Sequence, residues 1–146
     1  MKIHQLSLFL ENKPGQMTEP CRVLAAAGIS IRTLTLADTQ RFGILRLIVS
    51  DWQQARTQLE EAGYVVNITE VVAVEVSDRP GGLATMLELF DDRHINIEYM
   101  YAFTFSRDDR AVFIFRFDQP DAAIERLRAA GINVLEDVEV YHRITV

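Results

Sequence analysis

The sequence has little that would mark a secreted or membrane protein. Its 146 residues include a single cysteine, which excludes an internal disulfide and is typical of the reducing cytoplasm. No apolar run approaches the roughly 20 residues that a membrane-spanning helix needs. The N-terminal stretch also lacks the pattern of a signal peptide. We therefore expect a cytoplasmic protein with no membrane partner.

Positive charge is also scarce. The chain has 15 Lys and Arg against 21 Asp and Glu, which gives a net charge of −6. Without a basic stripe, binding to a phosphate backbone lacks its main electrostatic contribution. RNA-recognition domains share the order of elements predicted below, but their Lys/Arg-Gly-Phe signature is missing here. We expect no nucleic-acid partner.

Side chains suited to catalysis are few. The three histidines, His4, His94 and His142, have no carboxylate or cysteine at metal-ligand spacing. Cys21 lies on the apolar side of an expected helix with no base near it in the sequence, so we interpret it as a small core residue. No acid–base pair is visible either. We expect no catalytic residue, no metal and no cofactor, and therefore not an enzyme.

The most informative feature is an internal duplication. Asp78 to Asn96 reads DRPGGLATMLELFDDRHIN, a Pro-Gly-Gly turn followed by apolar residues at helical spacing. Asn12 to Ser30 reads NKPGQMTEPCRVLAAAGIS and lies 66 positions earlier. After the next hairpin the offset becomes 68, which two residues inserted near 107–110 explain. We interpret the chain as two tandem repeats.

Both repeats predict the order strand, helix, strand, strand, helix, strand. The first repeat predicts strands at Lys2–Leu10, Ser30–Ala37 and Phe42–Val49, and helices from the Pro14-Gly15 turn to about Ala27 and from Asp51 to about Ala62. The second repeat predicts strands at Ile95–Phe105 and around Phe113–Phe117, helices after Gly82 and over Gln119–Ala130, and extended chain over Ile132–Val146. This order makes an antiparallel sheet with both helices on one face, an α+β fold. The expected domains are residues 1–70 and 71–146.

Two features leave the packing of the repeats open. Tyr64–Ser77 contains no Gly or Pro, so it forms either two short strands with a bend near Asn67, or one long or exchanged strand that fuses the two sheets. The second repeat also has aromatic residues alternating along Ile95–Phe105 and Phe113–Phe117. Because this ladder is too apolar to be exposed, we expect a homodimer or the other repeat to cover part of it.

The two Pro-Gly corners are candidate ligand sites. A helix N-terminus has unpaired N–H groups that suit a carboxylate, and glycine allows a ligand close to the backbone. Asn12 and Asp78 precede the two turns and can accept hydrogen bonds from an ammonium group. Ser30 and Asn96 follow the helices, beside a strand expected to line the same edge. Together these groups suit an α-amino acid, although a Pro-Gly turn alone also simply starts a helix.

On these motifs the chain resembles the ACT domain family, ferredoxin-like regulatory modules that bind amino acids. The motifs are Asn12-x-Pro-Gly-x-Met17 with Gly28-Ile29-Ser30-Ile31, and Asp78-x-Pro-Gly-x-Leu83 with His94-Ile95-Asn96-Ile97. The resemblance covers nearly the whole chain, twice, as in a free-standing tandem ACT protein. At three positions the sequence departs from the family pattern. Ser30 and Asp78 stand where the family commonly has asparagine, and His94 stands where it usually has glycine.

The resemblance implies that an amino acid binds where two ACT modules meet. The implied contacts are Asn12, Pro14, Gly15, Gln16, Met17, Ser30, Asp78, Pro80, Gly81, Gly82, Leu83 and Asn96. The pair Asp78 and Asn96 forms the more complete polar set. We expect a dimeric regulatory protein that acts on an enzyme or transporter. The alternative is a structural or interaction module that has lost its ligand sites and docks on a partner enzyme.

Overall fold

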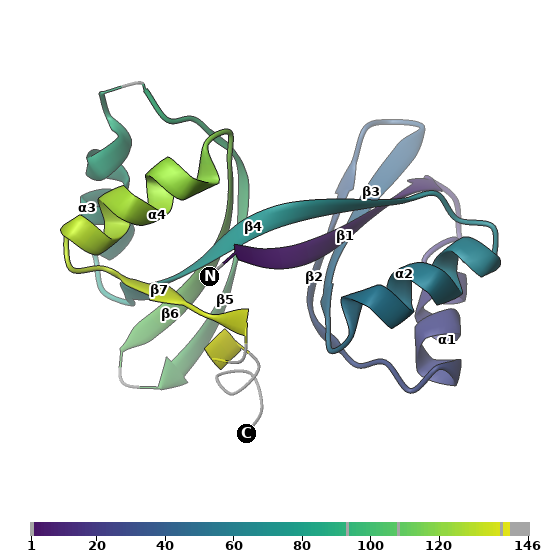
Figure 1. The fold of residues 1–146 in the computed structure, drawn as a ribbon. Coiled ribbons are helices and arrows are strands. Elements are labelled where there is room, and N and C mark those ends of the chain that lie inside the picture. The colour runs from purple at the N-terminus through teal and green to yellow at the C-terminus, as the bar shows by residue number, and fades with distance from the viewer. Residues whose placement is uncertain (1, 93, 108, 138, 141–146) are drawn as a thin grey trace. The chain divides into compact units, whose positions relative to one another are not determined.

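The computed structural model forms two compact units, His4–Thr69 (the N-terminal unit) and Met1–Ile3 with Glu70–Val146 (the C-terminal unit). It describes residues 2–92, 94–107, 109–137 and 139–140, and for 103–107 it describes the backbone alone. The elements are β1 Lys2–Glu11, α1 Thr18–Ala26, β2 Ile31–Asp38, β3 Phe42–Val49, α2 Trp52–Glu61, β4 Val66–Ser77, α3 Gly82–Leu87, η1 Glu88–Phe90, β5 Ile97–Arg107, β6 Arg110–Phe117, α4 Pro120–Ala129 and β7 Asn133–Leu135. Within each unit the two helices lie on one face of the strands (Figure 1).

The N-terminal unit has the strand order β2-β3-β1, with β1 and β3 antiparallel from Leu6↔Leu47 to Glu11↔Phe42. Alternation places Leu6, Leu8 and Leu10 in the core against the helices. α1 begins only at Thr18, which leaves Pro20 in its first turn, where a missing N–H is tolerated. Asp51 caps α2 by accepting a hydrogen bond from the Gln54 N–H, as the sequence predicts.

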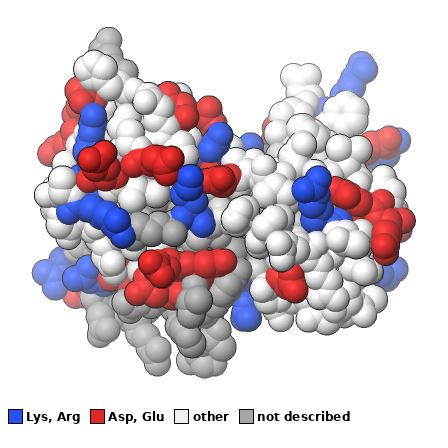
Figure 2. Space-filling view, viewed as in Figure 1, with Lys and Arg blue, Asp and Glu red and all other residues white. Residues whose placement is uncertain are grey.

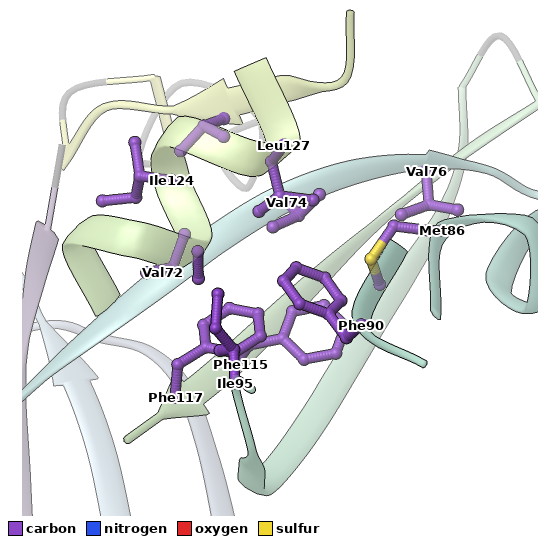
Figure 3. Close-up of a cluster of buried hydrophobic side chains, with 12 residues drawn as sticks. Val72, Val74, Val76, Met86, Phe90, Ile95, Phe115, Phe117, Ile124 and Leu127 are labelled. Carbon is purple, nitrogen blue, oxygen red and sulfur yellow. The ribbon is translucent and has the colours of Figure 1, made fainter. Parts of the chain in front are cut away.

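The C-terminal unit repeats this plan with the order β4-β6-β5 and β7 on the other side of β4. Valines of β4 and phenylalanines of β6 point toward apolar residues of α3, η1 and α4 (Figure 3). Phe115 is fully buried, and its ring centroid lies 5.4 Å from that of Phe117. Phe117 in turn lies 5.0 Å from Phe90. The helices therefore close over an aromatic core.

This arrangement divides the aromatic ladder between the two faces of the sheet. Phe115 pairs with Met100, whereas Tyr99 and Tyr101 pair with Arg116 and Ile114. The phenylalanines of β6 therefore face the unit's own helices, and the two tyrosines lie on the other face, because a register shift separates Ile97 from Tyr99. The ladder residues at 103 and 105 have side chains outside the described part of the chain.

The join between the repeats is a single strand. β4 runs from Val66 to Ser77 without interruption, so Asn67 lies inside a strand and not at a bend. The chain passes from one unit to the other within β4, between Thr69 and Glu70. The long-strand alternative is therefore the correct one for this segment.

The C-terminal segment departs from its prediction. β7 ends at Leu135, and residues 137, 139 and 140 are helical, so the expected extended chain stops there. The Glu136 N–H donates to the Glu139 carboxylate at 2.9 Å, which caps this turn. The rest of the expected extended segment, residues 141–146, lies outside the described residues.

The surface carries charged side chains of both signs. On the face drawn in Figure 2, acidic and basic side chains lie interspersed. Within the described residues, no helix is long and apolar enough to cross a membrane.

An ion pair ties the end of η1 to α4 and predicts a pH dependence of stability. Asp92 accepts hydrogen bonds from the Arg126 guanidinium at 2.9 Å and from the His94 N–H at 3.2 Å, and both lower its pKa to about 2. Because the folded pKa lies below the unfolded one, this stabilisation is present above about pH 4 and is lost as the pH falls toward 2. We expect Asp92→Asn to flatten that part of the pH profile of the melting temperature. An unchanged acid limb in the variant would contradict this assignment.

Candidate functional site

The first corner, between β1 and α1, is held by its backbone. Gly15 has φ +83°, a left-handed conformation that favours glycine, and its carbonyl accepts from the Thr18 N–H at 3.2 Å. No side chain caps the start of α1, which follows at Thr18. Of the first turn of this helix, the Thr18 N–H is thus already bonded and Pro20 has none, which leaves the Glu19 N–H to point out of the helix start.

Asn12 joins this corner to the β2–β3 hairpin. Its backbone N–H donates to the Arg41 carbonyl at 2.9 Å, and its side-chain Nδ2 donates to the Gln40 carbonyl at 3.0 Å. The side-chain Oδ1 is the atom that can accept a bond from a ligand. Next to it, Lys13 pairs with Glu11 at 2.7 Å, and this bond raises the pKa of Lys13.

A cavity of about 190 Å³ lies beside the first corner. It brings together Asn12, Gln16 and Met17 from the predicted set, and its other lining residues are Leu10, Glu11, Lys13, Leu36, Asp38 and Gly43. A Cβ on Gly43 would lie 3.1 Å from Leu36 Cδ1, so any larger residue there would push the Leu36 side chain aside. The cavity thus combines charges of both signs with apolar residues.

The second corner, between β4 and α3, is tighter. Gly81 has φ +87°, and its carbonyl accepts from both the N–H and the hydroxyl of Thr85. A Cβ on Gly82 would lie 2.1 Å from the Ser77 carbonyl oxygen, so no larger residue fits there without a shift. The Asp78 N–H donates to the Asp109 carbonyl at 2.6 Å, as Asn12 does to Arg41 in the first unit. The Asp78 side chain is exposed.

Ser30 and Asn96, which precede β2 and β5, form matching hydrogen bonds. Ser30 accepts at its carbonyl from the Ser50 N–H, and its own N–H donates to Ser50 Oγ at 3.1 Å. Asn96 makes the same pair of bonds with Asp118, at 3.1 and 2.8 Å. The duplication therefore extends to the hydrogen bonds that fix these positions.

Within one unit, however, the corner and the strand start do not meet. The corner contacts the hairpin where Asp38 pairs with Gly43, and Ser30 precedes the opposite end of β2, where Ile31 pairs with Val49. The eight residues of β2 span about 25 Å. The expectation that both line one edge of a module is therefore wrong inside a unit, because β2 runs away from the corner along its whole length.

Sequence reasoning missed several residues of the first cavity. Lys13 and Glu11 flank the Pro-Gly motif, and Leu36, Asp38 and Gly43 come from the hairpin. Strand alternation alone did not identify the hairpin residues, because they join the site only through the register of β1, β3 and β2. The exposure of the apolar Leu36 on β2 marks this region, but only in the folded structure.

The groups considered for metal binding have other environments. His4 stacks on Trp52 with ring centroids 4.3 Å apart, and the His94 N–H bonds to Asp92. Cys21 is half-buried on α1, and His142 lies outside the described residues. In the part of the chain that the structure describes, no three His, Cys, Asp or Glu side chains are arranged to hold a metal ion.

The order of elements defines a tandem pair of ferredoxin-like βαββαβ units. Residues 1–144 match the family model of the ACT domain pair, so the chain belongs to that family. None of the curated proteins compared with the sequence matches it.

Solved structures share the architecture. Protein BT0572 from Bacteroides thetaiotaomicron is 38% identical, covers 97% of this chain and 96% of its own, and has a TM-score of 0.89. The ligand-free regulatory subunit of aspartate kinase from Thermus thermophilus is 18% identical over 87% of this chain and 91% of its own, with a TM-score of 0.63. E. coli aspartokinase III in complex with lysine and aspartate is 16% identical over 89% of this chain and 31% of its own, with a TM-score of 0.54. The two kinase structures show similarity of fold alone.

Proposed function

We propose that the protein is a non-catalytic regulator that binds an amino acid where two ACT modules meet. Its modules would be residues 1–70 and 71–146, and it would act in the cytoplasm as a homodimer on a partner enzyme. Membership of the ACT domain pair family supports this proposal. The fold also occurs in a regulatory subunit of aspartate kinase, and in an aspartokinase whose structure contains lysine and aspartate.

The observation that carries the proposal is the cavity at the first corner. There Asn12, Gln16 and Met17 line one hollow with Lys13 and Asp38. Lys13 suits a ligand carboxylate, and Asp38 with the Asn12 Oδ1 suits an ammonium group. At about 190 Å³ the cavity is smaller than the roughly 300–1,000 Å³ of drug-sized pockets, which fits a small metabolite.

The second corner offers a related set of groups. Asp78 would accept from the ammonium group, and the backbone around Gly81 would approach the ligand closely. Asn96 and Ser30 would contribute from a neighbouring module. The proposed ligand contacts are Asn12, Pro14, Gly15, Gln16, Met17, Ser30, Asp78, Pro80, Gly81, Gly82, Leu83 and Asn96.

A second candidate function is docking alone, with ligand sites that have decayed. Exposed apolar side chains on the N-terminal unit favour it, among them Phe9, Leu36 and Phe42. β2 stands at the end of the strand order, and Leu34 and Leu36 on it are exposed, which suits pairing with a strand of another chain. The homodimer is compatible with both functions.

Calorimetry of the full chain against the twenty amino acids tests the proposal. We expect at least one amino acid to bind with about micromolar affinity, and Asp78→Ala or Asn12→Ala to weaken binding about tenfold or more through loss of a charge-assisted or amide hydrogen bond.

Asp91→Ala is the matched control for this experiment, because Asp91 is exposed and lies outside both corners. Unchanged affinity in Asp78→Ala would remove that residue from the site. No heat and no thermal shift with any amino acid would leave docking as the function.

A further inference from the structure

The N-terminal unit has an apolar patch on the face of its sheet that points away from the helices. The leucines of β1 face the helices, so alternation turns Phe9 to the other side. There Phe9 lies opposite Ile44 of β3, and Ile44 lies opposite Ala37 of β2. Phe42 begins β3 on the same face, two residues before Ile44. We call these four residues, Phe9, Ala37, Phe42 and Ile44, the outer patch.

The outer patch is open to solvent. Phe9 is 59% exposed and Phe42 is 49% exposed. Ala37 is also exposed, and Ile44 between them is half-buried. Single exposed apolar side chains are common on a monomer, but neighbouring ones that share a face of a sheet mark a contact with another molecule. The outer patch is therefore a candidate interaction surface.

The second repeat does not have this patch. Glu75 stands at the position of Phe9, and Arg110 stands at the position of Phe42, at the offsets of 66 and 68 that relate the repeats. Both repeats form the same βαββαβ unit, so the fold does not need large apolar residues at these two positions. The patch is thus a property of the first repeat, for which folding alone gives no reason.

The distribution of charge favours a second copy of this chain as the molecule that covers the patch. Residues 4–69 carry six basic and six acidic side chains, whereas residues 1–3 and 70–146 carry nine and fifteen. The whole net charge of −6 therefore belongs to the C-terminal unit. Two copies repel each other least where they meet through their neutral N-terminal units.

The border of the patch can match itself across a two-fold axis. Glu11 lies opposite Phe42 and pairs with Lys13 at 2.7 Å, and Arg41 directly precedes Phe42. Both signs of charge therefore lie at one end of the patch. In a two-fold dimer each surface meets its own copy, so a border of mixed sign finds opposite charges, whereas a border of one sign would repel itself.

An open hollow of about 390 Å³ adjoins this end of the patch. Its lining residues are Glu11, Asn12, Lys13, Gln40, Arg41 and Phe42. Phe9 projects from the same face of the sheet. Each copy thus offers both a projecting ring and a hollow that can receive the ring of its partner, as a two-fold interface requires.

We infer that the outer patch is the surface through which two copies of this chain form a homodimer, with the sheet faces of their N-terminal units packed together. Phe9 of each copy enters the hollow beside the partner's Phe42. The inference rests on the homodimer of the proposed function and names the surface that forms it. Because four side chains cover less than the roughly 800 Å² per partner of a standard interface, we expect a dissociation constant of tens of micromolar.

Sedimentation velocity of the full chain, from about 1 to 500 μM, tests this inference. We expect the 16.6 kDa monomer to give way to a dimer as the concentration rises. Phe9→Glu and Phe42→Glu each place a charge in the apolar interface and should each weaken association about tenfold or more. Val65→Glu is the matched control, because Val65 is 76% exposed in the same unit, lies outside the patch and should leave association unchanged.

Thermal unfolding at about 1 μM, where the chain is monomeric, checks that the variants fold. All three should unfold with the wild type, because each replaces an exposed side chain. If either phenylalanine variant does not fold, the other still tests the patch.

The outcomes separate this inference from the proposed function. A wild-type dimer that both phenylalanine variants leave intact overturns the inference, and the homodimer then uses another surface. Equal dissociation by Val65→Glu also overturns it, because added charge alone would then explain the loss. A wild-type monomer at every concentration overturns both the inference and the proposed homodimer, and leaves the patch to a different protein.

Discussion

Replacing Phe115 with alanine is expected to lower the free energy of unfolding by about 3–5 kcal/mol, the usual cost of removing a buried phenylalanine. Its side chain is fully buried between Phe113 and Phe117, whose ring centroids lie 6.1 and 5.4 Å away. The helices that close over this core cannot fill the space that the ring leaves. Loss of the ring therefore removes apolar burial and also creates a cavity.

Denaturant unfolding followed by circular dichroism and by the Met86 methyl signal measures this loss. The single tryptophan, Trp52, lies in the N-terminal unit, so its fluorescence reports on the other half of the chain. Phe9→Ala is the control, because Phe9 is 59% exposed and its loss should change stability by about 0.5 kcal/mol or less. A cost below about 1 kcal/mol for Phe115→Ala would contradict the described core.

The second large effect is expected from Gly82→Ala, at about 2–3 kcal/mol. The added Cβ would lie 2.1 Å from the Ser77 carbonyl oxygen. Ser77 is held in place by the pairing of β4 with β6, where it lies opposite Arg110, so the backbone cannot move away cheaply. The strain should therefore displace the start of α3 or the end of β4.

Thermal unfolding compares this variant with Gln16→Ala at the duplicated position, where the native residue already carries a side chain. We expect the control to unfold within a degree or two of the wild type and Gly82→Ala to unfold several degrees lower. Equal melting temperatures would show that the second corner is looser than the structure describes.

Most elements were predictable because their signals are local. β3 has the predicted bounds, Phe42–Val49, and Asp51 caps α2. Both follow from alternation and from a capping residue next to the helix it starts. The same local rules did not predict that residues 137, 139 and 140 are helical, where a short polar segment follows β7.

The errors concern partners that are distant in the sequence. Alternation along β5 and β6 did not show that the phenylalanines face the helices and the two tyrosines face away, because a register shift decides this. Ser30 and Asn12 were expected at one edge, but β2 separates them within a unit. Strand pairing decides both results. The alternation of residues along one strand does not show how that strand pairs with its neighbours.

The sequence by itself determined the duplication, the order of elements and the two glycine corners, because periodicity, turns and caps act between neighbouring residues. Only the tertiary structure decided where a cavity forms beside the corners. That choice depends on which side chains distant segments bring together, such as Gln16 after β1 with Leu36 and Asp38 of β2 at the first corner. Packing of this kind is a property of the assembled fold, where a few atoms of difference decide between a filled space and a cavity.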